Sequence, residues 1–173
     1  MKRKVFFGLL LVCLSLVISC LTIYKKLNKR PPPKFPNELP CFSLVTLDHI
    51  PVIADSLNNH PIIVVYYSPD CLFCEHEGKE LARYSSDFEG YQVLFVTCAP
   101  ADSAAAYTTR TGIGAVAHFY SLVDTTYRLP LHFGIRTTPT TLIYGGDRRL
   151  ITFFEGEVNA AKLLKAIQKE NVR

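Results

Sequence analysis

The sequence predicts an α/β domain with a central mixed β-sheet, helices on both faces and an added N-terminal β-hairpin. Two observations support this prediction. The segments Pro61–Tyr67 and Tyr91–Ala99 are continuous apolar runs of strand length, which are typical of strands buried on both faces. A helical pattern follows each of them, so these two strands should be parallel, whereas the last two strands of the chain should form an antiparallel hairpin.

The first half of the domain contains a hairpin, two strands and two helices. The segments Cys41–Asp48 and Ile50–Ile53 predict the short added hairpin. From Cys71 to about Phe88, apolar and small residues recur every three or four positions, which predicts an amphipathic helix. The segment 102–112 predicts a second helix that ends at Gly112.

The second half continues with shorter elements. Residues 115–124 can form a short strand, and residues 124–135 predict a mostly helical connector. Residues 139–157 predict a hairpin whose turn is Gly145-Gly146-Asp147. Residues 157–170 predict an amphipathic helix, with these apolar residues facing inward: Val158, Leu163, Leu164 and Ile167.

The N-terminal 34 residues differ sharply in charge from the rest of the chain. They hold eight Lys or Arg and no acid, a formal charge of +8, whereas residues 35–173 hold 11 bases and 15 acids, and 11 − 15 = −4. The folded part lacks a basic stripe, which argues against a nucleic-acid partner. The basic N-terminal part suits anionic lipid headgroups instead.

Val5–Ile23 is a run of 19 uncharged residues, long enough as a helix to cross most of a hydrocarbon core. Two interpretations stay open: an uncleaved signal anchor, which the length favours, or a lipoprotein signal in which the segment Val17–Cys20 (VISC) is processed and Cys20 lipidated. We therefore divide the chain into a membrane anchor or lipoprotein signal (1–24), a basic Pro-rich linker (25–37) and the folded domain (38–173).

Two of the six cysteines, Cys71 and Cys74, have a spacing that indicates chemistry. A structural zinc site needs four ligands, usually two such pairs or a Cys pair with a His pair. The sequence has one such pair, and its five histidines show no His-x₃₋₅-His spacing. We therefore expect no metal site and interpret the pair as a redox couple.

The position of the pair supports the redox interpretation, because a buried strand ends and a helix begins there. With Asp70 or Ser68 as the helix cap, Cys71 should lie near the first helical position, where the helix dipole favours a thiolate. Cys74, one turn further on, should point inward. Carboxylates nearby oppose this effect because they raise the pKa of a thiol, so the net shift stays open.

The segment SPDCLFC, followed by a helix and later by TTPT (137–140) before a hairpin and a final helix, resembles thioredoxin-fold proteins, in particular the membrane-tethered thiol-disulfide oxidoreductases of the TlpA/ResA (redoxin) type. The resemblance extends from about Phe35 to the C-terminus. It implies an enzyme tethered in the bacterial cell envelope, with its domain facing the periplasm or the outside. Its partners would be exported proteins with thiols or disulfides and an unidentified membrane or periplasmic electron donor. The resemblance favours a reductant over an oxidant. It also implies that the enzyme needs no cofactor beyond the Cys71–Cys74 disulfide.

The resemblance also implies roles for single residues. Pro139 would follow a cis peptide bond and face the disulfide, and the backbone of Thr138 would bind an extended substrate strand. Glu77 matches a carboxylate that moves protons for the resolving thiol Cys74, although its spacing fits a solvated glutamate on the helix surface equally well.

Two departures from the pattern matter for the chemistry. Val65 replaces the buried aspartate of thioredoxin, so Glu77 or water would have to serve as any base. Leu72-Phe73 replaces Gly-Pro between the cysteines, which keeps the direction of electron flow open. The tyrosines before the motif have no predicted chemistry. Cys98 could lie near the couple, pair with Cys41 or be a buried free thiol, and the last is favoured.

Two other functions stay as alternatives. A peroxiredoxin-type peroxidase would need a Thr and a Pro where this chain has Ser68 and Val64. A non-enzymatic copper or thiol chaperone would bind metal through the two motif cysteines and a distant histidine such as His132.

Overall fold

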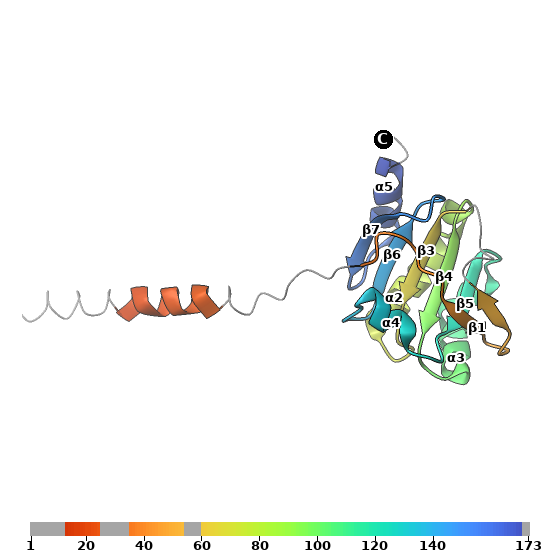
Figure 1. The fold of residues 1–173 in the computed structure, drawn as a ribbon, viewed down its shortest axis with the longest axis horizontal. Coiled ribbons are helices and arrows are strands. Elements are labelled where there is room, and N and C mark those ends of the chain that lie inside the picture. Colours follow the sequence, from red (N-terminus) through yellow and green to blue (C-terminus); the bar gives the residue numbers. More distant parts are fainter. Residues whose placement is uncertain (1–12, 25–34, 54–59, 171–173) are drawn as a thin grey trace, which may run out of the picture. The chain divides into compact units, whose positions relative to one another are not determined.

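The computed structural model describes residues 13–24, 35–53 and 60–170 (Figure 1). The chain divides into two units, residues 1–33 and 34–173. In the first unit, residues 13–24 form a helix whose large apolar side chains are exposed. Within the described ranges, no helix has the length and apolar character needed to cross a membrane. Residues 5–12 of the predicted apolar span and most of the predicted linker lie outside the described residues.

The second unit is built on one mixed sheet of seven strands in the order β2-β1-β5-β4-β3-β6-β7. The strands are β1 (Ser43–Thr46), β2 (Pro51–Ile53), β3 (Ile62–Tyr66), β4 (Gln92–Thr97), β5 (Phe119–Val123), β6 (Thr140–Tyr144) and β7 (Leu150–Glu155). The neighbours β3–β4 and β4–β5 are parallel, and the remaining pairs are antiparallel. The predicted fold class, including the added hairpin β1–β2, is confirmed.

Helices cover both faces of this sheet (Figure 1). They are α2 (Leu72–Arg83), α3 (Ala101–Thr111), α4 (Arg128–Phe133) and α5 (Ala160–Glu170), with short 3₁₀ turns at Ser85–Phe88 and Ile113–Ala115. Side chains of β3 alternate between two apolar cores: Ile63 and Val65 pack with α2, α3 and α5, whereas Ile62 and Val64 pack with α4. The burial of β3 on both faces explains its uninterrupted apolar sequence.

Two segments differ in detail from the prediction. The expected helix from Cys71 to Phe88 divides at Tyr84 into α2 and a 3₁₀ turn. The folded domain begins at Phe35, inside the predicted linker 25–37, because Phe35 is buried with its ring centroid 4.4 Å from that of Phe153. The chain there also joins the sheet edge, since Leu150 N donates to the Asn37 carbonyl at 2.8 Å.

Candidate active site

The CxxC motif lies where β3 ends and α2 begins, as predicted. Cys71 is the N-cap of α2, and its sulfur accepts a hydrogen bond from Cys74 N at 3.2 Å. The expectation that Asp70 or Ser68 would cap this helix is therefore wrong, because the sulfur itself occupies the acceptor position. This arrangement places the Cys71 sulfur against an N–H at the positive end of a helix, which stabilises negative charge on it.

The two cysteines differ in accessibility and are joined to each other. Cys71 is half-buried, whereas Cys74 is only 1% exposed and belongs to the core. They form a disulfide across one helical turn, with their Cα atoms 5.2 Å apart. The intervening Leu72 and Phe73 are exposed, so the motif presents one accessible sulfur on an apolar surface.

The Thr138–Pro139 peptide bond lies beside the couple and is cis, as predicted. The Thr138 carbonyl oxygen is 3.6 Å from Cys71 Sγ. Antiparallel pairing of β3 with β6, in the register Tyr66 opposite Thr140, brings these segments together. In the reduced protein, the Cys71 thiol could donate a hydrogen bond to this carbonyl.

Glu77 is fully buried, so the interpretation as a solvated surface glutamate is wrong. Its Oε1 accepts a hydrogen bond from Thr141 Oγ1 at 2.6 Å, and its Oε2 accepts one from Val158 N at 3.0 Å. Burial raises the pKa of Glu77 to about 7, although both hydrogen bonds oppose this shift. Glu77 lies three residues after Cys74, on the same buried side of α2.

Glu75 is an ion-paired carboxylate next to the couple. Its Oε1 accepts a hydrogen bond from Lys79 Nζ at 2.6 Å, and its Oε2 accepts one from Arg110 Nε at 3.2 Å. These two bonds, with Lys79 as the larger cause, lower the pKa of Glu75. Sequence reasoning missed Arg110, which comes from α3. The four-residue spacing of Glu75 and Lys79 was a local signal for part of this network, but no local signal pointed to Arg110.

Cys98 follows β4 and forms no disulfide. Its sulfur accepts a hydrogen bond from Tyr66 OH at 3.4 Å. Burial raises the pKa of the Cys98 thiol, the bond from Tyr66 opposes the shift, and the charge of Asp124 adds to it. Cys98 is therefore a partly buried free thiol, close to the alternative that the sequence favours, and the possible pairing with Cys41 does not occur.

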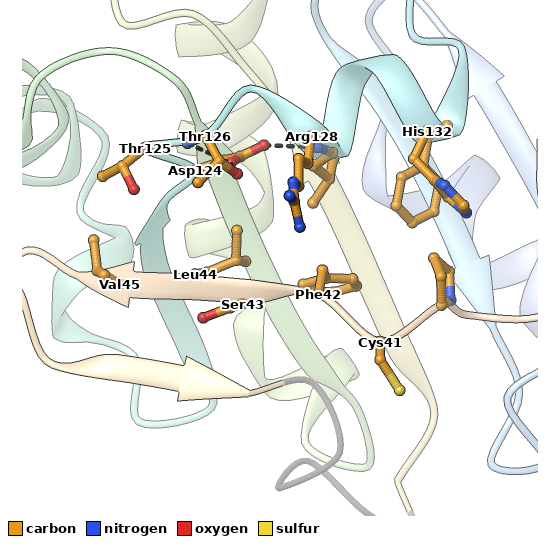
Figure 2. A pocket seen from close by; sticks show the side chains of 13 residues that line it. Cys41, Phe42, Ser43, Leu44, Val45, Asp124, Thr125, Thr126, Arg128 and His132 are labelled. Carbon is orange, nitrogen blue, oxygen red and sulfur yellow. Dashed lines mark hydrogen bonds between the residues drawn. The ribbon is translucent and has the colours of Figure 1, made fainter.

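The cavity shown in Figure 2, about 310 Å³ in volume, is separate from the couple. It lies between the segment 40–45 and the β5–α4 region, and its lining includes Asp124, Arg128 and His132 but no residue of the CxxC motif. The carboxylate of Asp124 accepts hydrogen bonds from Thr126 and from Leu129 N. In the described part of the chain, no three His, Cys, Asp or Glu side chains lie together as metal ligands would.

Comparisons with known proteins agree with this geometry. Residues 53–171 match the family described as the thioredoxin-like domain, whereas a comparison with curated proteins finds no match. A secreted disulfide oxidoreductase of Mycobacterium tuberculosis, homologous to Escherichia coli DsbE, is 17% identical with a TM-score of 0.64, covering 74% of this chain and 95% of its own.

Two further solved structures have the same fold. The peroxidoxin BcpB of Mycobacterium tuberculosis is 17% identical with a TM-score of 0.67, covering 80% of this chain and 98% of its own. The exposed lipoprotein thioredoxin Etrx1 of Streptococcus pneumoniae is 18% identical with a TM-score of 0.59, covering 75% of this chain and 99% of its own. At these identities the likeness shows the fold alone.

Proposed function

Because the chain belongs to the thioredoxin-like domain family, we propose that it is a membrane-tethered thiol-disulfide oxidoreductase that reduces disulfides of exported proteins. One observation carries the proposal: a half-buried sulfur at the N-cap of α2 is joined to a buried sulfur one turn on, beside the cis Thr138–Pro139 bond. The reaction needs no cofactor beyond the Cys71–Cys74 disulfide.

The reaction begins with the reduced couple. The Cys71 thiolate attacks one sulfur of a substrate disulfide, so that a mixed disulfide forms and the other substrate sulfur leaves as a thiolate, which takes up a proton. The Cys74 thiolate then attacks the Cys71 sulfur, which releases the second substrate thiol and forms the Cys71–Cys74 disulfide. Two electrons pass to the substrate, and a dithiol donor must supply two electrons to restore the couple.

Glu77 and Thr138 are assigned supporting roles. Cys74 is buried and must lose a proton before it can attack, and Glu77 lies one turn away on the same side with a pKa of about 7. Glu77 therefore accepts that proton, directly or through water, at neutral pH. Thr138, partly exposed beside Cys71 and ahead of Pro139, offers its backbone to an extended substrate segment.

Tethering in the bacterial cell envelope is proposed from the N-terminal sequence. The uncharged run Val5–Ile23 with its basic flanks can anchor the chain, or Cys20 can carry a lipid, and the domain then faces the periplasm or the outside. A membrane or periplasmic protein then serves as the electron donor. The test is membrane partitioning of the full-length chain. Mass spectrometry of the mature N-terminus distinguishes an intact Met1 from a lipidated Cys20, and recovery of unprocessed protein in the soluble fraction would contradict both.

Substrate trapping tests the division of labour between the two cysteines. Cys74→Ser should accumulate a covalent complex with substrate protein that dithiothreitol releases, whereas Cys71→Ser should be inactive and accumulate little. Cys98→Ser is the matched control and should behave as wild type. The reverse trapping pattern would exchange the two roles, and retained activity in both variants would refute the couple.

Two further measurements test the kind of reaction. Consumption of peroxide by the protein would identify a peroxidase instead of an oxidoreductase that acts on protein disulfides. The reduction potential of the couple decides between reductant and oxidant.

A further inference from the structure

Arg110 contacts the chain on both sides of the CxxC motif. It lies in the last turn of α3. Its Nη2 donates to the Pro69 carbonyl at 2.8 Å, and its Nε donates to Glu75 Oε2 at 3.2 Å. Pro69 lies two residues before Cys71, and Glu75 directly follows Cys74, so that one guanidinium spans the whole motif.

The contact with Pro69 anchors the loop between β3 and α2. Pro69 is buried, and Arg110 is the hydrogen-bond partner that the structure gives to its carbonyl oxygen. The same loop turns through a bond from Cys71 N to the Ser68 carbonyl at 3.1 Å. A shift of this loop would move the Cys71 sulfur relative to α2 and to the Thr138 carbonyl.

The contact with Glu75 balances charge beside the couple. A carboxylate near a thiol disfavours the thiolate, and Glu75 is in the first turn of α2. Arg110 and Lys79 each hold one of its oxygens. The planar guanidinium has several donors, so it can bind a carboxylate and a carbonyl at once, for which the compact ammonium group of Lys is less well suited.

Other titratable groups lie on the segments around the couple: Asp70 on the preceding loop, His76 and Glu77 on α2, Tyr107 on α3 and Glu157 before α5. Tyr107 OH donates to the Cys74 carbonyl at 2.7 Å, and His76 Nδ1 lies 3.9 Å from Glu157. Glu77 is bound by Thr141 and Val158. In the described part of the chain, Arg110 is the side chain whose hydrogen bonds connect the two sides of the motif.

We propose that Arg110 is a positioning residue of the redox couple: by bridging Pro69 and Glu75 it holds the motif in place and offsets a negative charge that would disfavour the Cys71 thiolate. The inference rests on the proposed function. A stabilised thiolate stabilises the reduced couple, so Arg110 makes the couple a stronger oxidant than it would otherwise be. It thus moderates the reducing power of the protein.

The test compares Arg110→Gln with wild type in the full-length protein in mild detergent. Peptide-resolved mass spectrometry follows iodoacetamide labelling of Cys71 across a pH series, and equilibration with glutathione gives the reduction potential. In Arg110→Gln the labelling midpoint should move to higher pH, and labelling at pH 7 should slow about three- to tenfold. The equilibrium should shift toward the disulfide by the same factor, and a tenfold shift is about 30 mV for this two-electron couple.

Control variants separate charge from structure. Arg83→Gln removes an exposed cation that stacks on Tyr84 and should leave the midpoint and the potential unchanged. Arg110→Lys keeps a cation beside Glu75 and should restore most of the shift in midpoint. Glu75→Gln combined with Arg110→Gln should bring the midpoint back toward wild type, because the uncompensated carboxylate is gone.

Each result decides the matter. A folded Arg110→Gln protein with the wild-type midpoint and potential would overturn the proposal, even if it melted at a lower temperature. If Arg110→Gln does not fold, Glu75→Gln alone must lower the labelling midpoint, and an unchanged midpoint would overturn the proposal instead. If wild type does not equilibrate with glutathione as a Cys71–Cys74 couple, the proposed function itself fails, and the role of Arg110 fails with it.

Discussion

Two buried carboxylates near the carboxyl ends of the central strands differ in the hydrogen bonds that they accept. Asp124, at the end of β5, accepts hydrogen bonds from the backbone N–H groups of Thr126 and Leu129 and from the Thr126 hydroxyl. Glu77, on α2 beside the couple, accepts one bond from a hydroxyl and one from a backbone N–H. Both side chains are almost completely excluded from solvent.

The difference shows that a buried carboxylate can be bound by donors of one local turn or by donors from distant segments. Three donors from one local turn bind Asp124 and tie the chain between β5 and α4. Fewer donors, from two distant segments, leave burial as the larger effect on Glu77, whose pKa rises to about 7. A carboxyl with this pKa changes its protonation near neutral pH, which the role proposed for Glu77 requires.

The largest effect on stability is expected at Asp124. Asp124→Ala leaves buried donors without partners, including Leu129 N, and should lower the free energy of unfolding by about 3 to 5 kcal/mol at pH 7. The measurement is urea denaturation, with the exposed Asp87→Ala as the matched control. The labelling rate of Cys71 should stay unchanged in the folded protein. A loss of less than about 1 kcal/mol, or a changed labelling rate, would remove the contrast between the two carboxylates.

The next effect is pH-dependent and comes from Glu77. Its folded pKa is about 7, above its usual value of 4.5, so the folded state binds the proton more tightly and stability falls as pH rises between these values. Between pH 5 and pH 8 this group should lower the free energy of unfolding by about 2 to 3 kcal/mol. Glu77→Gln should remove that fall, and reductase activity should lose its dependence on a group titrating near pH 7.

Denaturation of both proteins at the two pH values checks this prediction. Equal pH dependence in wild type and Glu77→Gln would mean that Glu77 does not titrate in this range. Asp87→Asn serves as the control, because Asp87 is an exposed carboxylate that is not among the groups shifting the pKa of Glu77.

The smallest effect is expected at Thr141, whose hydroxyl donates to Glu77 Oε1. Thr141→Val removes this donor with little change of shape, so it should raise the pKa of Glu77 further. It should also lower the free energy of unfolding by about 1 to 2 kcal/mol. Carboxyl NMR titration of Glu77 gives the pKa directly. Thr152→Val on β7 is a control that removes a hydroxyl outside this contact. A lowered or unchanged pKa of Glu77 in Thr141→Val would show that the hydrogen bond from Thr141 does not stabilise the charged carboxylate.

Local patterns in the sequence were sufficient for the order of strands and helices and for the place of the couple. Continuous apolar runs marked β3 and β4 because both faces of these strands are buried, and three-residue spacing put both cysteines on one helical turn. The fold and its family are confirmed, and so is the cis bond before Pro139. These features depend on residues close together in the chain or on a motif of fixed spacing.

Only the tertiary structure decided what surrounds the couple. Glu77 became a buried group with a raised pKa because Thr141 and Val158, 64 and 81 residues further along, close over it. Arg110 reaches Glu75 and Pro69 across the contact between α3 and α2. Periodicity tells which side of a helix is apolar, but not which distant residue packs against it. Burial and charge compensation depend on those distant contacts, so the pKa values that set the chemistry could not be obtained from the sequence alone.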